Sequence, residues 1–215
     1  MQNQVVGTRE RIRKFVDDRM YIVIEADAAC DLYTAGASLL RHVGEAPDAG
    51  SHRADEAVAR LQRALAGVGP LENMLKERYT ILTARRGKLI VGALRAVEHD
   101  ESELGLEMSA PIVLEAFWEL RDLAALAPRC GVATTLVAVL CGVQSERVLA
   151  ACPATVLGYE ATGFYADIGF QPTGPDLTLS AERQREVLAI ARELGVDVRP
   201  GKGVPSGGPL YAAWV

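Results

Sequence analysis

The chain has 215 residues, of which 49% are hydrophobic and 24% are charged, so it carries enough apolar material for a substantial folded core. Its formal net charge of -5 argues against nucleic acid as a partner, because duplex-binding surfaces usually carry a basic excess. We find no apolar run of the length that a signal peptide or a membrane span needs, which predicts a cytoplasmic protein without a membrane partner. The cysteines lack C-x-x-C spacing, so we expect free thiols and no metal site; they are Cys30, Cys130, Cys141 and Cys152.

The first third of the chain alternates helical and extended patterns. In chain order we expect a short basic helix, a strand, an amphipathic helix, a polar loop, a second amphipathic helix and a short helical piece. These fall at 8–18, 20–26, 28–43, 45–55, around 58–65 and at 71–76.

Residues 78–97 give the clearest hairpin pattern. Tyr79 to Ala84 is strand-like, residues 85–88 form a turn in which Gly87 supplies positive φ, and Leu89 to Val97 returns. We interpret the acidic run that follows, 98–103, as a solvated loop.

The second half of the chain predicts a sheet interleaved with helices. We expect an extended stretch within 111–126, a buried helix from Val132 to Cys141 that stops at Gly142, a strand, and a helix that ends at Gly169. After these we expect an edge strand, an amphipathic helix capped by Ser180 and ended by Gly195, an irregular loop and a closing strand. The strands fall at 117–123, 147–152, 176–178 and 210–215, the helix at 181–194 and the loop at 199–208.

This order predicts one domain over 1–215 of the α/β (α+β) class. Helices would flank a mixed, mostly antiparallel sheet, and an extra helix would precede the last strand.

Two segments bear on chemistry. Pro128 to Ala133 turns through Gly131 into the apolar helix, and such a turn offers backbone N–H groups to a phosphate-bearing ligand. A purely structural turn would have the same sequence.

The second segment is 161–170, where Gly169 lets a helix end in a left-handed residue and Phe170 can tuck back beneath it. Tyr165 of this helix is either a half-buried packing residue or a proton donor to a leaving group.

Together these segments resemble the GNAT superfamily of acyl-CoA-dependent N-acyltransferases. Gly131-Val132-Ala133 matches the G-x-A part of that family's pyrophosphate loop, and the hairpin at 86–92 is similar to its central strands. The second signature of the family matches at Ala161, Phe164, Tyr165, Gly169 and Phe170. The resemblance covers residues 78–172. Pro128 stands where the family usually has Gln or Arg, and Gly158 where it often has Asn.

The resemblance implies transfer of an acetyl or other acyl group from acyl-CoA, the cosubstrate, to an amine of a small molecule. It places the donor between two parallel strands that end near Leu123 and Cys152. The donor-binding positions it implies are Leu123, Ala124, Ala125, Arg129, Cys130, Gly131, Val132, Ala133, Thr134 and Ala161.

The resemblance also implies catalytic roles. Tyr165 would protonate the departing thiolate, and Glu119 would remove a proton from the amine. Strand alternation would put Glu119, Arg121 and Leu123 on one face, with Leu120 and Asp122 on the other. For Glu119 the structural alternative is an ion pair with Arg121 or a neighbour.

Several alternatives stay open at this level. The donor could instead be linked to an acyl-carrier protein or carry a long acyl chain, or the chain could be a degenerate, non-catalytic binding protein. Cys130 lies at a helix start, where a thiol pKa is lowered, so a covalent role is conceivable. We assign His42, His52 and His99 to the surface, and an exposed edge strand at 210–215 would permit a homodimer.

Overall fold

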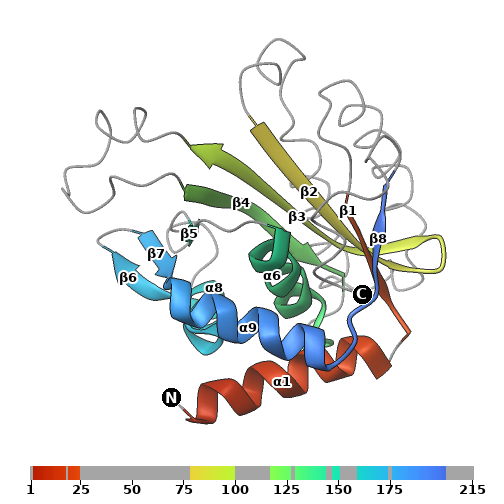
Figure 1. Ribbon diagram of the computed structural model, residues 1–215, viewed down its shortest axis with the longest axis horizontal. Helices are drawn as coiled ribbons and strands as arrows, with labels where there is room; N and C mark the ends of the chain where they lie inside the picture. The colour runs from red at the N-terminus through yellow and green to blue at the C-terminus, as the bar shows by residue number, and fades with distance from the viewer. Residues whose placement is uncertain are drawn as a thin grey trace.

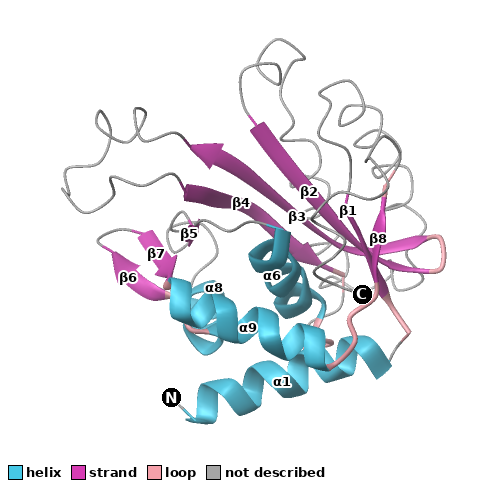
Figure 2. Cartoon of the chain, viewed as in Figure 1, coloured by secondary structure: helices cyan, strands magenta, loops and turns pink. Residues whose placement is uncertain are grey.

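The computed structural model describes residues 2–17, 19–24, 78–99, 117–126, 129–143, 147–150, 159–173 and 176–201 (Figures 1 and 2). The helices are α1 (Gln2–Asp17), α6 (Val132–Val143), α8 (Tyr159–Ile168) and α9 (Ala181–Glu193). The strands are β1 (Tyr21–Ile24), β2 (Arg78–Arg86), β3 (Leu89–His99), β4 (Phe117–Ala125), β5 (Arg147–Ala150), β6 (Gln171–Thr173), β7 (Asp176–Leu179) and β8 (Val198–Pro200).

The described strands form one sheet in the order β6-β7-β5-β4-β3-β2-β1-β8. The neighbours β4 and β5 are parallel, as are β1 and β8, and all other neighbouring strands are antiparallel. The expected α+β class with a mixed, mostly antiparallel sheet is confirmed.

The described helices gather on one side of this sheet (Figure 1). Helix α6 lies directly on the central strands, where its residues from Leu136 to Leu140 are fully buried, so the expected buried helix is confirmed. Helix α1 packs against α6, α8 and α9, and its residues Ile12 and Phe15 are also fully buried. Helix α6 therefore forms the centre of the core, between the sheet and the outer helices.

The hairpin is confirmed, with Gly87 at a φ of 63° in its turn. Strand β3 is longer than expected, however, and includes Glu98 and His99, which pair across the sheet with Trp118 and Phe117 of β4. The sequence places these two residues in a solvated loop because the acidic run begins at Glu98, but pairing with β4 continues the strand.

The end of α8 has the geometry that the sequence predicts. Gly169 has a φ of 103°, and the Phe170 N–H donates to the Tyr165 carbonyl oxygen at 3.0 Å. Phe170 is buried beneath the helix. The cap of α9 is also confirmed, because the Ser180 hydroxyl accepts a hydrogen bond from the Arg183 N–H at 3.2 Å.

Other expectations need correction. Helix α1 begins at Gln2, six residues before the expected start at 8, and α6 continues through Gly142 to Val143. Strand β7 is not an edge strand, because the unexpected strand β6 pairs with its outer side. Part of the expected loop at 199–208 belongs to β8, which pairs in parallel with β1.

The expected helices within 28–76, the loop at 45–55 and the closing strand at 210–215 lie outside the described residues. So do Cys30, Cys152, His42 and His52. Within the described ranges, no helix combines the length and the apolar character that crossing a bilayer requires.

Candidate active site

A β-bulge at Arg121 determines which side chains of β4 lie together. Leu120 pairs with Ala96 of β3 and Asp122 pairs with Arg95, so Arg121 is an extra residue between two registered pairs. Glu119 pairs with Val97, and Val97 and Arg95 lie on the same face of β3 because they are two residues apart. Glu119 and Asp122 therefore share a face. The alternation expected from the sequence, with these two residues on opposite faces, is wrong because the bulge shifts it.

Five polar side chains gather on the β3–β4 pair at this bulge. Arg95 and His99 come from β3, and Glu119, Arg121 and Asp122 from β4; we call them the charged row. At one end, Arg95 Nε and Nη2 bond to Asp122 Oδ2 at 2.6 and 2.5 Å, and Arg95 is buried. Burial raises the pKa of Asp122 in spite of the opposing effect of Arg95.

Glu119 lies at the other end of the charged row and is bonded on both sides. Its Oε2 atom lies 2.7 Å from His99 Nε2 and 2.9 Å from Arg121 Nε. Burial alone would raise the pKa of Glu119, but the hydrogen bonds from His99 and Arg121 outweigh it and lower the pKa below its ordinary value. The ion pair with Arg121, foreseen as the structural alternative for Glu119, is present.

His99 is not the surface residue that the sequence suggests. Its side chain is only 20% exposed, and its ring stacks on the Phe117 ring with 4.8 Å between centroids and 9° between planes. The stack and the bond to Glu119 together fix the orientation of the imidazole.

Tyr165 lies in the core on the inner side of α8, with a relative exposure of 6%. Its ring makes edge contacts with Phe164 and Phe170, each with 5.2 Å between centroids. Its hydroxyl makes no hydrogen bond to any residue that the structure describes. Burial raises the pKa of Tyr165 strongly, and the nearby Asp122 carboxylate adds to the increase. A phenol of this kind stays protonated at neutral pH.

The chain bends sharply before α6. Arg129 and Gly131 have φ values of 62° and 83°, and the carbonyl oxygen of Gly131 accepts bonds from the N–H and the hydroxyl of Thr135. The amides of Val132 and Ala133 precede the first intrahelical donor, as at any helix start.

Helix α1 lies directly against this bend. A Cβ atom on Gly131 would collide with the backbone carbonyl of Arg11 and approach the Phe15 nitrogen. Gly131 therefore has a packing reason to be glycine that its sequence context does not reveal. The Arg11 side chain continues to α8, where its Nη2 atom bonds to Asp167 Oδ2 at 2.6 Å.

The structure places the other predicted donor-binding residues as follows. Arg129 is exposed, Cys130 and Ala133 are half-buried, and Val132 and Thr134 are buried. Leu123, Ala124 and Ala125 pair with β3 on one side, whereas the described pairing of β4 with β5 ends at Leu120 and Ala150. Ala161 falls in the first turn of α8. Pro128 and Gly158 lie outside the described residues.

Sequence reasoning missed His99, Arg95 and Asp122. The available signal was spacing, because Arg95 and His99 are four residues apart and therefore share a face of a strand. This spacing predicts the charged row only if one already knows that β3 extends to His99 and that β4 has a bulge at Arg121.

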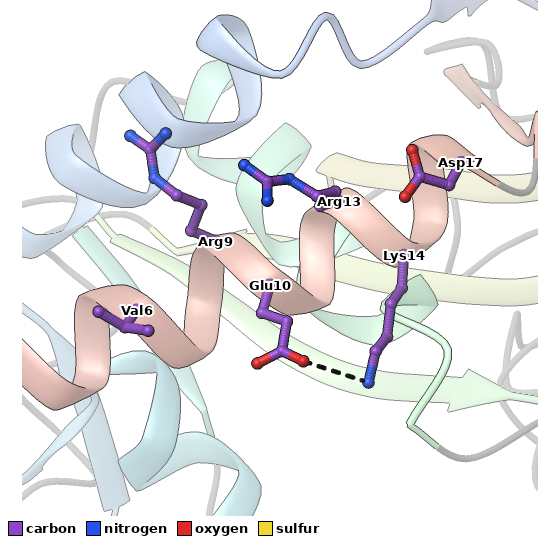
Figure 3. Close-up of a pocket in the computed structure, with 6 residues that line it drawn as sticks. All are labelled: Val6, Arg9, Glu10, Arg13, Lys14 and Asp17. Carbon is purple, nitrogen blue, oxygen red and sulfur yellow. Dashed lines mark ion pairs between the residues drawn. The ribbon is translucent and has the colours of Figure 1, made fainter.

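A shallow hollow on α1 is the other surface feature of note (Figure 3). Its lining residues are Val6, Arg9, Glu10, Arg13, Lys14 and Asp17. All six belong to one helix, and Lys14 Nζ lies 3.7 Å from Glu10 Oε1. The hollow is thus the outer surface of α1, and among the described residues none of the charged row lines it.

No protein-family model matches the sequence, and a search of curated proteins finds no match.

Proposed function

We propose that the protein is an N-acyltransferase of the GNAT type, which moves an acetyl or other acyl group from acyl-CoA to an amine of a small molecule. The observation that carries this proposal is Tyr165. It is a buried phenol without a hydrogen-bond partner among the described residues, on the helix that follows β5. Buried polar groups in folded proteins are nearly always bonded, so an unpaired one at this place suggests a ligand.

The strand arrangement gives the donor a place. Parallel neighbours β4 and β5 are paired from Phe117 to Leu120, and β4 continues to Ala125. The backbone of Leu123 to Ala125 would bond to the amides of the pantetheine arm on the side that faces away from β3. Helix α6 starts a few residues later, and its first amides would bind the anionic diphosphate.

The chemistry requires a proton donor and a proton acceptor. The amine nitrogen attacks the thioester carbonyl carbon, and a C–N bond forms as the amine gives up its proton to Glu119, directly or through water. The C–S bond breaks as Tyr165 gives its phenolic proton to the sulfur, and transfer of the proton from Glu119 to the phenolate through solvent restores both groups. A free thiol has a pKa of about 8.5, below that of a free phenol, so this transfer would be uphill in water. Burial beside Tyr165 also disfavours the thiolate, which makes proton transfer concerted with C–S cleavage the favourable course.

The test combines a binding measurement with a turnover measurement. Calorimetry should detect binding of acetyl-CoA or a longer acyl-CoA to the purified protein, and thiol release in the presence of amines should report transfer. In the Tyr165→Phe variant, binding should persist within about threefold while kcat falls by about 100-fold, because general acid catalysis typically contributes 10²–10⁴-fold.

Failure of the wild-type protein to bind any acyl-CoA would overturn the proposal. Parallel assays with an acyl-carrier-protein donor and with long-chain acyl-CoA would identify a different donor on the same fold. Unchanged turnover in Tyr165→Phe would remove the phenol from the mechanism while leaving the activity in place.

A further inference from the structure

The carboxyl end of α8 is held by cations from two other helices. Helix α8 contains no lysine or arginine, although the last carbonyls of a helix carry partial negative charge and favour a nearby cation. Arg183 of α9 supplies one, because its Nε donates to the Ile168 carbonyl at 2.9 Å. Arg11 of α1 supplies a second through its bond to the Asp167 carboxylate. The turn of α8 that carries Tyr165 is therefore fixed by side chains that its own sequence does not provide.

The Arg183 side chain lies directly on the backbone at Gly169. A Cβ atom at this position would overlap the arginine from its Cγ to its Nε, so glycine leaves the room that the arginine occupies. The next residue, Phe170, is buried; its N–H bonds to the Tyr165 carbonyl at 3.0 Å, and its ring makes an edge contact with the Tyr165 ring. Arg183 is thus joined to Tyr165 through two consecutive residues, Gly169 and Phe170.

The guanidinium of Arg183 has a fixed orientation. Arg183 is buried, its Nη2 donates to the Thr8 hydroxyl of α1 at 3.0 Å, and its Nη1 bonds to Glu186 Oε2 at 2.5 Å. Thr8 is fixed in turn, because its hydroxyl donates to the Gln4 carbonyl at 2.9 Å. All three guanidinium nitrogens are bonded, and a planar group bonded in three directions cannot turn. The orientation of α8 relative to α1 and α9 is therefore set at this arginine.

The position of the Tyr165 phenol depends on packing. Its hydroxyl has no hydrogen bond to any residue that the structure describes, so the ring is placed by the α8 backbone and by its contacts with Phe164 and Phe170. Proton transfer needs the two heavy atoms within about 2.6–3.2 Å of each other, and a displacement of about 1 Å can cost about 100-fold in rate. A small movement of the end of α8 would therefore take the phenol out of reach of the sulfur.

We infer that Arg183 is a positioning residue, which holds Tyr165 where it can give its proton to the leaving sulfur. This inference rests on the proposed acyl transfer and deepens it. Arg183 takes no part in the bond changes and acts through Ile168, Gly169 and Phe170. Helix α9, which packs against α1 and α6, gains in this way an influence on the reaction.

The experiment is a double-mutant cycle. It measures kcat and KM for the wild type, Arg183→Lys, Tyr165→Phe and the double variant, with acetyl-CoA and a panel of primary amines. Each protein is assayed at a temperature at which circular dichroism shows it folded. Lysine keeps the positive charge of Arg183 but lacks its planar fork of donors.

The expected result differs between the two backgrounds. Arg183→Lys should lower kcat by at least tenfold in the wild-type chain while both KM values stay within twofold. In the Tyr165→Phe chain it should lower kcat by less than twofold, because the phenol that it positions is already gone. A purely structural role of Arg183 would lower kcat alike in both backgrounds.

Two further variants complete the design. Arg185→Lys is the matched control, since Arg185 is exposed on the same helix and its Nε bonds to the Ala181 carbonyl; its kcat should equal that of the wild type. Thr8→Val tests the same link where Arg183→Lys is too unstable to assay. Valine has the shape of threonine but removes the hydroxyl that accepts from Arg183, so kcat should fall about threefold, and only where Tyr165 is present.

A second readout needs no substrate. The chain has six tyrosines, so the Tyr165 ring signals can be assigned by their loss from the NMR spectrum of Tyr165→Phe. These signals should shift in Arg183→Lys and in Thr8→Val, whereas the other tyrosine signals stay in place. Arg185→Lys should leave all of them unchanged.

The outcomes separate the two proposals. An active wild type in which Arg183→Lys lowers kcat less than twofold, or lowers it equally with and without the Tyr165 hydroxyl, overturns the inference and leaves acyl transfer standing. Tyr165 signals that do not move in Arg183→Lys overturn it as well. A wild type that binds no acyl donor overturns acyl transfer, and with it the catalytic meaning of the Arg183 link, even where the Tyr165 signals move.

Discussion

The backbone carbonyl of Arg11 lies where a side chain on Gly131 would have to go. Gly131 also has a φ of 83°, so an alanine there meets backbone strain as well as a collision with α1. This contact joins the start of the chain to the start of its most buried helix.

We predict that Gly131→Ala lowers the free energy of unfolding by about 2–4 kcal/mol, the sum of left-handed strain and overpacking. Gly87→Ala is the matched control. Gly87 has a φ of 63° but nothing within contact distance of an added Cβ, so only the strain of about 1–2 kcal/mol should appear. Urea denaturation of both variants measures the difference, and equal losses would show that α1 does not constrain the bend.

Removing the Tyr165 hydroxyl should not harm stability. The hydroxyl is buried without a described partner, so Tyr165→Phe should leave the free energy of unfolding unchanged or raise it by up to about 1 kcal/mol. Tyr21→Phe is the contrasting variant, since the Tyr21 hydroxyl donates to the Gly87 carbonyl at 2.5 Å and its loss should cost about 0.5–1.5 kcal/mol. A loss at Tyr165 larger than that at Tyr21 would mean that its hydroxyl is bonded in solution.

Arg183 connects three helices and should be hard to replace. From α9, its Nε donates to the Ile168 carbonyl at the end of α8 at 2.9 Å, and its Nη2 donates to the Thr8 hydroxyl of α1 at 3.0 Å. Arg183 is 8% exposed, so Arg183→Met should cost about 2–4 kcal/mol through the unpaired groups that it leaves.

Two further variants sharpen the test at Arg183. Arg183→Lys should restore little of the stability, because a lysine ammonium lacks the planar fork of donors with which arginine reaches both the Ile168 carbonyl and the Thr8 hydroxyl. Arg185→Met, which removes an exposed arginine from the same helix, should change the free energy of unfolding by less than about 0.5 kcal/mol. Similar effects at the two positions would contradict the bridging role.

Acid should weaken the contribution of Glu119 to the free energy of unfolding. Its pKa is lower in the folded protein than in the unfolded chain, so the unfolded state binds more protons in acid and stability rises with pH. The contribution is fully present above the ordinary glutamate pKa of about 4.3 and is lost as pH falls through the lower folded value. The difference in unfolding free energy between wild type and Glu119→Gln should shrink on acidification from pH 6 to pH 3.

Asp122 contributes a pH dependence of stability with the opposite sign, and the variant Asp122→Asn serves as the comparison. Because its pKa is raised in the folded protein, ionisation of Asp122 costs stability as pH increases through its titration range. Asp122→Asn should therefore shift the acid side of the stability profile in the direction opposite to Glu119→Gln. Parallel shifts would show that burial does not dominate at Asp122.

Much of the fold could be predicted because its signals are local. The apolar run of α6, the turn at Gly87, the pair Gly169 and Phe170, and the Ser180 cap each act within a few residues, and the structure confirms them. The strands β6 and β8 escaped prediction because three residues are too short to show alternation, and each contains a proline, which is rare inside strands.

The charged row could not be predicted for a different reason. One extra residue at Arg121 reverses the alternation along the rest of β4, and nothing in the local sequence indicates a bulge there. Tyr165 and Glu119 could be chosen from the sequence, but the partner of Glu119 could not. The acidic residues that follow His99 are typical of a loop, whereas its position opposite Phe117 depends on pairing with a strand about twenty residues away.

The parallel pairing of β1 with β8 has a consequence for synthesis. Ile22 to Ile24 can pair with Val198 to Pro200 only after residue 200 has been synthesised, more than 170 residues after β1. Ile12 and Phe15 face a similar delay, since α6, α8 and α9 all come later. The apolar side chains of α1 and β1 are therefore exposed to solvent during synthesis before their later partners exist. At that stage the nascent chain is vulnerable to aggregation, and binding by a chaperone would protect it.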